Sequence, residues 1–156
     1  MNGSLLMDNK LKRYDTAYME TAYVFSKLSH AVRKKVGCIA VKDGNIIAHG
    51  WNGMPAGFEN SCEDEIPCTH CRYPDNSCTY CNGSGKILQT KKECLHAELN
   101  VLSKLAKGTA SSDGSTLYVT LSPCVECSKL IIQSGIRRVL YHEEYRDLSG
   151  VEFLKS

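Results

Sequence analysis

Two short motifs in the second half of the chain combine metal-binding side chains with a nearby carboxylate. His96 and Glu98 lie in "CLHAELN", and Cys124 and Cys127 lie in "SPCVECSKL". One histidine and two thiolates can hold zinc and leave its fourth position open for water, which the metal acidifies at catalytic sites. Glu98 follows His96 by two residues, where a carboxylate can shuttle the protons of that water. The sequence therefore predicts a catalytic zinc site with Glu98 as its acid and base.

Each motif is weak support when taken alone, because H-x-E is common by chance and a single C-x-x-C can be a redox pair or half of a structural zinc site. The combination is more informative. His96 and Cys124 are separated by 27 residues, and Cys124 belongs to P-C-x-x-C directly after a predicted strand. This order is typical of zinc-dependent nucleobase deaminases. The spacing therefore favours hydrolytic deamination over a redox function.

A second group of cysteines precedes these motifs, in "CTHCRYPDNSCTYC". It holds two C-x-x-C pairs separated by six residues, which are Cys68 with Cys71 and Cys78 with Cys81. Four thiolates fill every position of a tetrahedral zinc, so we expect a structural zinc there. Because six residues make a short loop, one of the four could be replaced by Cys62, His70 or Cys94. Cys94 is the strongest replacement, since it stands close to His96, and we expect the cluster to brace the start of the catalytic helix.

The composition indicates one globular domain over residues 1–156, because 42% of the residues are hydrophobic and 23% are charged. A net charge of +2 is too small for a dedicated nucleic-acid binder. No apolar run approaches the roughly 20 residues that span a bilayer, and the first residues lack the apolar core of a signal peptide. Nine cysteines, mostly in C-x-x-C pairs, favour zinc thiolates in the reducing cytoplasm, while Cys38 fits a core residue.

The elements before the catalytic motifs follow from apolar periodicity. Spacings of three and four over Leu11–Ser29 predict an amphipathic helix. Val36–Val41 and Ile46–His49 are typical of strands, joined by a tight hairpin at Asp43-Gly44. Residues 50–93 have almost no periodic apolar pattern, so we expect a long functional loop that the cysteines staple.

Regular structure resumes at the catalytic motifs. "HAELNVLSKLAKG" predicts a helix that begins at His96 and ends at Gly108, and Thr116–Thr120 predicts a strand. The next helix has Ser122 as its expected N-cap and Gly135 after its last turn. "RRVLYH" predicts a further strand, while the C-terminal "YRDLSGVEFLKS" fits a helix or a strand. Alternating strands and helices predict an α/β sandwich.

Four blocks of sequence resemble the cytidine deaminase superfamily, in particular its deoxycytidylate-acting branch: "GWNGMPAGF", "CLHAELN", "LYVTLSPCVECSKLIIQSGI" and "EEYRD". The resemblance runs from about Ser26 to Asp147. It implies one domain folded as a three-layer α-β-α sandwich, with a five-stranded mixed sheet and a cysteine-rich zinc-binding insertion over about residues 58–94. It also implies hydrolysis of dCMP to dUMP and ammonia, with zinc held by His96, Cys124 and Cys127.

The resemblance also implies how the substrate is held. The residues that it places there are Asn52, Ala97, Ser122, Tyr145, Ser29 and Arg33. Asn52 would hold the deoxyribose, Tyr145 would stack on the base, and Ser29 and Arg33 would bind the 5′-phosphate. From the residues alone, "NG" also fits a turn, Tyr145 also fits a partly buried structural tyrosine, and "SHAVRKK" also fits a solvated charged face.

Regulation is implied in the same way. The loop "GWNGMPAGF" is similar to the allosteric site of regulated members, where dCTP activates and dTTP inhibits with magnesium on the triphosphate. The residues assigned to that site are Gly50, Trp51, Asn52, Gly53, Met54 and Gly57. Glycine lets backbone N–H groups approach phosphates closely. The resemblance also implies a homohexamer with effectors near the subunit contacts, and neither stable nucleic-acid binding nor membrane attachment.

Two other classes of function stay open. Another branch of the superfamily could act on a nucleoside, a riboflavin precursor or tRNA adenosine, although the low net charge and the insertion disfavour tRNA. "CTYCNGSG" resembles the zinc-ribbon repeat of Hsp40-type chaperones, which would make the chain an interaction module. One such unit is weak support, and a binding module has no need of the H-x-E and P-C-x-x-C pair.

Overall fold

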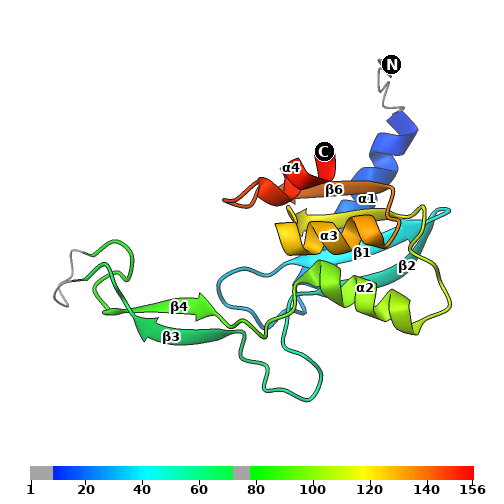
Figure 1. Ribbon diagram of the computed structural model, residues 1–156. Coiled ribbons are helices and arrows are strands. Elements are labelled where there is room, and N and C mark those ends of the chain that lie inside the picture. The colour runs from blue at the N-terminus through cyan, green and yellow to red at the C-terminus, as the bar shows by residue number, and fades with distance from the viewer. Residues whose placement is uncertain (1–8, 72–77) are drawn as a thin grey trace.

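The computed structural model describes residues 9–71 and 78–156 and shows a sheet between two layers of helices (Figure 1). Its strand order is β2-β1-β5-β6. These strands are β1 (Gly37–Lys42), β2 (Asn45–Trp51), β5 (Thr116–Leu121) and β6 (Arg138–Glu143). β1 is antiparallel to both of its neighbours, whereas β5 and β6 run parallel. The sheet is therefore mixed, as the resemblance implies.

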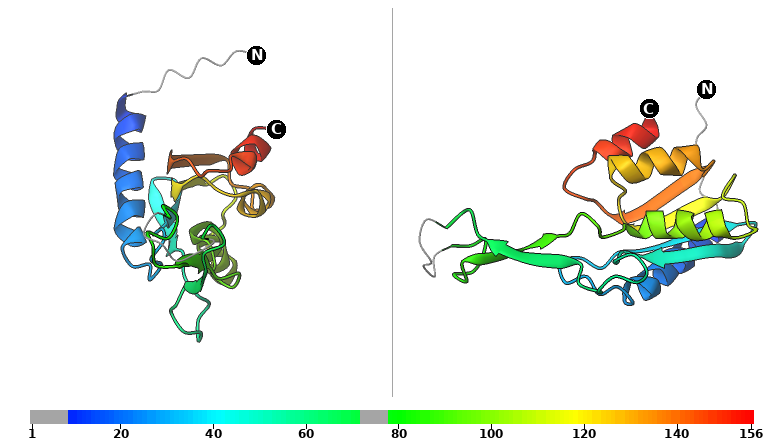
Figure 2. Two further views of the ribbon diagram at one scale, coloured as in Figure 1. Left: turned by 90° about the vertical axis from the view of Figure 1, so that its left-hand side faces the viewer. Right: turned by 60° about the horizontal axis from the view of Figure 1, so that its bottom comes forward.

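The helices form the two outer layers. α1 (Asn9–Ser26) covers one face of the sheet, and α2 (Ala97–Lys107) and α3 (Val125–Gln133) cover the other (Figure 2). α4 (Ser149–Lys155) packs against α3. This arrangement confirms the three-layer α-β-α sandwich. Within the described ranges, no helix is both long enough and apolar enough to cross a membrane.

The central strand β1 is buried on both faces, because helices cover the sheet from both sides. Cys38 and Ala40 belong to the core beneath α2 and α3, whereas Ile39 and Val41 belong to the core beneath α1. All four side chains are buried. A strand in this position has a continuous apolar run instead of an alternating one. Cys38 is therefore a core residue, as predicted.

The hairpin between β1 and β2 turns at Asp43 and Gly44, as predicted. Both residues have positive φ, 50° and 76° respectively. Two consecutive residues of this kind form the turn whose twist matches that of the flanking strands. The hairpin makes β2 the edge strand of the sheet and delivers Trp51 and Asn52 to the base of α2.

The main sheet and the first helix differ in extent from the sequence-based expectation. Within the described residues the sheet has four strands, one fewer than the resemblance implies, and the C-terminal segment forms α4 instead of a strand. α1 ends at Ser26, before the predicted end at Ser29. The next three residues form hydrogen bonds to carbonyls three positions earlier, which is a tighter turn than an α-helix.

The start of α3 also differs from the expectation. Its N-cap is Cys124, not Ser122. The Ser122 hydroxyl instead accepts a hydrogen bond of 2.7 Å from the backbone N–H of Tyr145. A tertiary partner therefore overrides the local capping preference of this serine, and the bond ties the segment after β6 to the end of β5.

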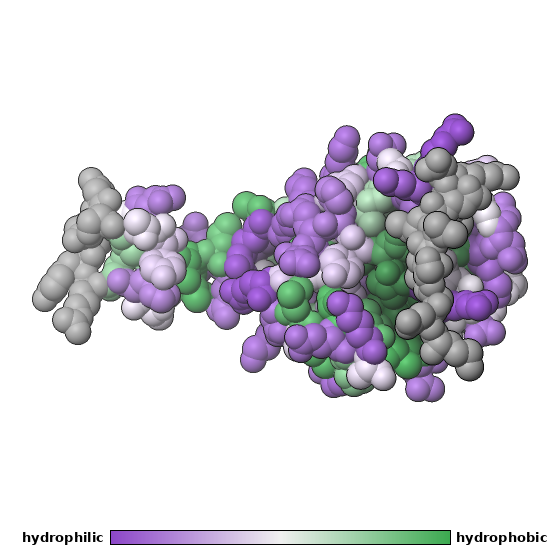
Figure 3. Space-filling model, turned by 90° about the horizontal axis from the view of Figure 1, so that it is seen from above, coloured by the Kyte–Doolittle hydropathy of each residue, from purple (hydrophilic) through white to green (hydrophobic). Residues whose placement is uncertain are grey.

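The segment between β2 and α2 is not the irregular loop that its composition suggested. It contains an antiparallel pair, β3 (Glu63–Pro67) and β4 (Lys86–Thr90), which projects from the body of the molecule (Figures 1, 2 and 3). We call residues 63–90 the arm. Most side chains of its strands are exposed, although Ile66 lies opposite Ile87 in the ladder. The arm has little apolar pattern because it has no buried face, so periodicity could not reveal it.

Candidate active site

Three potential metal ligands meet where two helices begin. His96 is the N-cap residue of α2, Cys124 is the N-cap residue of α3, and Cys127 is buried in the first turn of α3. His96 Nδ1 lies 3.5 Å from Cys124 Sγ and 3.4 Å from Cys127 Sγ. Neither side chain forms a capping hydrogen bond. These side chains are therefore available to one another and to a shared metal ion.

The donor set and its spacing fit zinc. Bonds of about 2.0 to 2.3 Å at tetrahedral angles place neighbouring ligand atoms about 3.3 to 3.8 Å apart. Hydrogen bonding with Cys127, and then with His96, lowers the pKa of the Cys124 thiol to about 3, which favours the thiolate that zinc requires. Cys127 is buried whereas His96 is exposed. A three-ligand set that is open on one side is typical of a catalytic zinc site.

Glu98 lies in the first turn of α2 and is 4% exposed. Burial raises the pKa of its carboxyl above the ordinary 4.5, although its backbone N–H and His96 oppose the shift. The helix that begins at His96 therefore also presents a carboxyl beside the ligand set. A carboxyl whose pKa moves toward neutrality can both accept and donate protons.

A cavity of about 410 Å³ adjoins this ligand set. The predicted site residues that line it are Arg33, Asn52, His96, Ala97, Glu98, Ser122, Cys124 and Tyr145. Cys94 also lines the cavity, although the sequence indicated it only as an alternative zinc ligand. The remaining residues of the cavity wall were not singled out from the sequence, and these are Lys34, Val36, Glu63, Gln89, Thr90, Leu121 and Arg146. Its size falls within the range of small-molecule sites. The fold thus brings most of the predicted substrate contacts to one place.

Asn52 lines the cavity, but its side chain also holds the backbone. Its Oδ1 accepts a hydrogen bond from Val36 N at 2.8 Å, and its Nδ2 donates to Lys34 O at 2.9 Å. Ser29 lies behind it: the serine hydroxyl donates to Asn52 O at 2.8 Å and accepts from Ala31 N at 3.1 Å. Ser29 is 2% exposed and does not line the cavity. The structure therefore places Ser29 as a support for Asn52, away from the expected phosphate position.

Tyr145 and Arg146 form another part of the cavity wall. The guanidinium carbon of Arg146 lies 5.7 Å from the centroid of the Tyr145 ring, which is within range of a cation–π contact. Arg146 and Lys34 each adjoin a predicted residue in the sequence, and that neighbour was the only available signal for them. Together with Arg33 they place three cationic side chains on the wall, which suits an anionic group on a ligand.

The loop "GWNGMPAGF" lines a second cavity of about 330 Å³. Its wall consists of Leu28, His30, Gly50, Trp51, Gly53, Met54, Ala56, Asn60, Asn100 and Lys104. Asn52 lines the first cavity instead, and Gly57 lines neither of the two. The structure therefore brings four of the six predicted allosteric residues together in this cavity.

Two glycines of this loop serve packing and pairing. A Cβ on Gly50 would lie 3.0 Å from Ala97 O, so glycine lets α2 approach β2 closely. Gly53 N donates to Leu95 O at 3.0 Å in a short bridge. This N–H group was expected to be free to bind a phosphate, but it is already bonded. A cation is available in its place, because Lys104 lines the cavity with its Nζ 5.1 Å from the centroid of the Trp51 ring.

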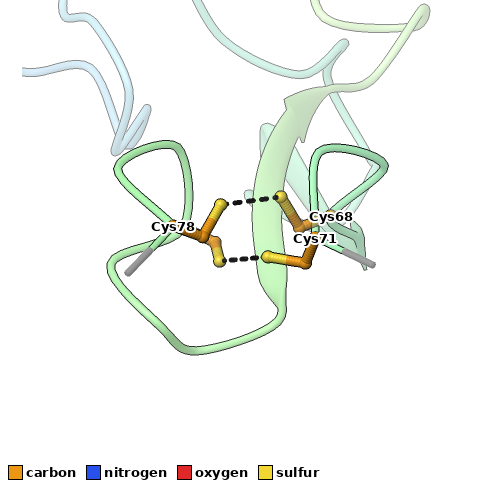
Figure 4. A group of neighbouring side chains, drawn as sticks. Cys68, Cys71 and Cys78 are labelled. Carbon is orange, nitrogen blue, oxygen red and sulfur yellow. Dashed lines mark hydrogen bonds between the residues drawn. The ribbon is translucent and has the colours of Figure 1, made fainter. Parts of the chain in front are cut away.

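The four cysteines of the arm converge beyond the Pro67–Lys86 end of the β3–β4 ladder (Figure 4). The Sγ atoms of Cys68 and Cys78 are 3.9 Å apart, and those of Cys71 and Cys81 are 3.1 Å apart. All four sulfur atoms lie within 4.8 Å of one another, which fits a closed four-thiolate zinc site. Hydrogen bonding with Cys71 lowers the pKa of Cys81 to about 6. Residues 72–77, between the two pairs, lie outside the described ranges.

Among the described residues, none of the three alternative ligands joins this four-thiol cluster. His70 stacks on Tyr80, with ring centroids 3.9 Å apart. Cys62 and Cys94 lie at the root of the arm, in a small buried cluster with Ala31. The prediction that the four-thiol cluster braces the catalytic helix is therefore wrong, because the β3–β4 ladder carries the C-x-x-C pairs away from α2 (Figure 1).

Comparisons with known proteins agree with this geometry. Residues 12–143 match a family model described as the cytidine and deoxycytidylate deaminase zinc-binding region. The deoxycytidylate deaminase of Schizosaccharomyces pombe is 37% identical over 142 residues, which cover 90% of this chain but 41% of that protein. The deoxycytidylate deaminase of Enterobacteria phage T4 is 33% identical over 147 residues, covering 81% of this chain and 76% of that protein. The chain thus spans less than half the length of the first relative.

The fold comparison extends over almost the whole chain. The crystal structure of the dCMP deaminase from cyanophage S-TIM5, in complex with dCMP and dUMP, has a TM-score of 0.74 and 43% sequence identity. The match covers 96% of this chain and 93% of that one. The residues matched by the family model include both zinc motifs and the arm. The chain therefore belongs to the cytidine and deoxycytidylate deaminase family.

Proposed function

We propose that this chain is a hydrolase that converts dCMP to dUMP and ammonia. The observation that carries the proposal is the buried Glu98 carboxyl beside the His96, Cys124 and Cys127 set, in a cavity with cationic side chains on its wall. The ligand set and carboxyl suit hydrolysis of a ring amine, and the cationic wall suits a 5′-phosphate. The relatives named deoxycytidylate deaminase support the same substrate.

Glu98 performs the proton transfers in this proposal. His96, Cys124 and Cys127 would hold a zinc ion, which would supply the Lewis acidity that makes water a nucleophile at neutral pH. The Glu98 carboxylate takes a proton from that water, because burial raises its proton affinity. Glu98 delivers that proton to N3 of the cytosine ring. It then takes the proton of the new C4 hydroxyl and delivers it to the amino group, so that ammonia leaves and the C4 carbonyl forms. One buried carboxyl thus acts first as base and then as acid.

The other cavity residues hold the nucleotide. Tyr145 stacks on the base, and its backbone is fixed by the hydrogen bond to Ser122. Asn52 contacts the deoxyribose while its amide is oriented by the backbone before β1. Ala97 adds a small, fully buried contact at the start of α2. Arg33, with Lys34 and Arg146 beside it on the cavity wall, binds the 5′-phosphate.

Regulation belongs to the second cavity in this proposal, with dCTP as activator, dTTP as inhibitor and magnesium on the triphosphate. α2 supports the link, because it begins at the catalytic residues and contributes Asn100 and Lys104 to that cavity. Asn100 Nδ2 also donates to Trp51 O at 2.7 Å, which connects α2 to the allosteric loop. An effector that shifts this contact would move α2 relative to β2. We place this regulation in a homohexamer.

A second zinc and the cellular location complete the proposal. Cys68, Cys71, Cys78 and Cys81 hold a structural zinc, as the convergence of their thiols supports. All nine cysteines are free thiols, which suits the reducing cytoplasm.

A substrate panel tests the activity. Zinc-loaded protein is incubated with dCMP, deoxycytidine, dCTP or tRNA, each with and without dCTP or dTTP as effector, and ammonia release is measured. We expect kcat/KM for dCMP to exceed that for deoxycytidine by at least about a hundredfold, because the nucleoside offers no anionic group to Arg33 and Arg146 on the cavity wall. Equal turnover of dCMP and deoxycytidine would contradict the proposal. Turnover of tRNA alone would assign the chain to another branch of the family.

A further inference from the structure

The root of the arm forms part of the catalytic cavity. Glu63 is the first residue of β3, Thr90 is the last residue of β4, and both line the cavity together with Gln89. These residues lie outside both zinc motifs and outside the loop "GWNGMPAGF". The arm thus lines the cavity at one end of its ladder and carries the four-thiol cluster beyond the other end.

Glu63 holds the backbone of the turn before β1. Its two carboxylate oxygens accept hydrogen bonds from Val32 N at 3.1 and 3.2 Å, and Arg33 N donates to one of them at 3.1 Å. Hydrogen bonds between a carboxylate and backbone N–H groups are stronger than neutral ones. Glu63 thereby fixes the orientation of the peptide units from which the Arg33 side chain extends.

Thr90 holds the side chain of the same arginine. Arg33 Nη1 donates to Thr90 Oγ1 at 3.2 Å. Glu63 and Thr90 lie directly opposite each other in the β3–β4 ladder. One cross-strand pair at the root of the arm therefore holds both the backbone and the guanidinium of Arg33.

The charge of Arg33 stays available to a ligand. Within the ranges that the structure describes, Arg33 forms no ion pair, whereas its neighbour Lys34 pairs with Glu143. The Thr90 hydroxyl is neutral, so it orients the guanidinium without cancelling its charge. A guanidinium has five N–H donors in a planar fork, and most of them remain for a phosphate group.

We propose that the arm is a specificity element, in which the Glu63–Thr90 pair positions Arg33 to bind the 5′-phosphate of the substrate. This inference rests on the proposed dCMP function and assigns the residues behind its preference for a nucleotide. Glu63 and Thr90 are positioning residues, since each acts through Arg33. The four-thiol cluster lies beyond the other end of the same ladder, where it keeps the register that sets Glu63 opposite Thr90.

Glu63→Gln, compared with Glu65→Gln, tests the carboxylate. The amide oxygen could replace Oε1, which accepts from both backbone N–H groups, but the amide hydrogens would then face Val32 N–H in place of Oε2. The negative charge that strengthens these hydrogen bonds would also be lost. We expect KM for dCMP to rise about tenfold, with most of the loss in kcat/KM carried by KM. The preference for dCMP over deoxycytidine should fall by about the same factor. Glu65 pairs with Lys86 at 3.0 Å on the exposed arm, so its variant should match the unaltered chain.

Variants of Thr90 and Arg33 test whether the Glu63 carboxylate and the Thr90 hydroxyl both act through Arg33. Thr90→Ser keeps the hydroxyl and should keep KM, whereas Thr90→Val removes it and should raise KM severalfold. Arg33→Ala should raise KM for dCMP by roughly thirtyfold. Glu63→Gln should have little further effect once Arg33 is replaced, because two residues that act through one contact are not additive.

Several outcomes would overturn the inference and leave the dCMP function intact. These are equal KM values for Glu63→Gln and Glu65→Gln, additive effects of Glu63→Gln and Arg33→Ala, or a loss confined to kcat. If Glu63→Gln does not fold, the comparison of Thr90→Ser with Thr90→Val decides, and equal KM values for these two would likewise reject it. Failure of the unaltered chain to deaminate dCMP would overturn both this inference and the proposed function.

Discussion

Glu98 concentrates the proposed chemistry in one side chain, because it is buried, lies beside the candidate zinc ligands and does not belong to that group. Glu98→Gln should lower kcat by about a thousandfold, since general acid–base catalysis contributes on the order of 10² to 10⁴ in rate. The variant should keep its zinc and its fold, as metal analysis and thermal melting can measure. The same change at Glu126, which is exposed and pairs with Lys129 at 2.7 Å, is the matched control. Loss of the catalytic zinc from Glu98→Gln would show that Glu98 acts as a ligand instead.

At the scale of the element, the arm is a two-stranded ladder with little buried apolar surface, so it needs a crosslink to be stable. A structural zinc supplies such a crosslink, because the free energy of metal binding is part of the free energy of folding. The position of the four-thiol cluster near the far end of the ladder therefore predicts that metal loss disorders the arm before it disturbs the catalytic ligands.

Replacing both Cys78 and Cys81 by alanine tests whether the four-thiol cluster stabilises the arm independently of the catalytic ligands. We expect zinc content to fall from two ions per chain to one, since the structure has two separate ligand groups. KM for dCMP should rise severalfold through the arm root, while His96, Cys124 and Cys127 keep their metal. Replacing Cys62 and Cys94 in the same way is the control, because these thiols pack at the arm root outside either group, and both zincs should remain. Loss of both metals from the Cys78 and Cys81 variant would contradict the assignment.

At the scale of the whole molecule, Asp15 ties the outer helix α1 to the sheet. Its carboxylate pairs with Arg138 of β6 through two hydrogen bonds of 2.8 and 2.7 Å, and the Tyr118 hydroxyl of β5 donates to it at 2.6 Å. Hydrogen bonding with Arg138 lowers the pKa of Asp15 below the ordinary 3.8, although burial opposes the shift. This group of three joins the α1 layer to two strands of the sheet.

Asp15→Asn should lower the free energy of unfolding by about 2 kcal/mol at neutral pH, because it leaves a partly buried arginine without its partner. The folded chain binds fewer protons at Asp15 than the unfolded chain, so the stability from this pair is present above pH 3.8 and is lost as pH falls through the lowered folded pKa. In urea titrations, the difference in the free energy of unfolding between the unaltered chain and Asp15→Asn should therefore shrink only below pH 3.8. Asp64→Asn is the control, since Asp64 is exposed and lies 3.5 Å from Lys91. A difference that stays constant at lower pH would contradict the assignment to Asp15.

Local rules were sufficient to predict the candidate ligands, which the structure brings together, and most of the elements of the sandwich. Zinc chemistry restricts the ligands to a few residue types, and the spacing of three residues brings Cys124, the N-cap of α3, close to Cys127 in the first turn. The apolar periods predicted α1, α2 and the strands of the main sheet, because each of these elements buries apolar side chains in one or both of the cores on the two faces of the sheet. The Asp43-Gly44 turn was predicted for a similar reason, since few residues adopt two consecutive positive φ values.

The sequence by itself therefore predicted the layers of the fold, the candidate ligands His96, Cys124 and Cys127 that the structure brings together, and the buried Glu98 beside them. Only the tertiary structure decided that the four-thiol cluster lies away from α2, that Ser122 bonds to Tyr145 instead of capping α3, and that Ser29 lies behind Asn52. It also decided that Thr90 contacts Arg33, 57 positions away in the chain. These contacts depend on strand register and side-chain direction between distant segments, and no local pattern of residues encodes either.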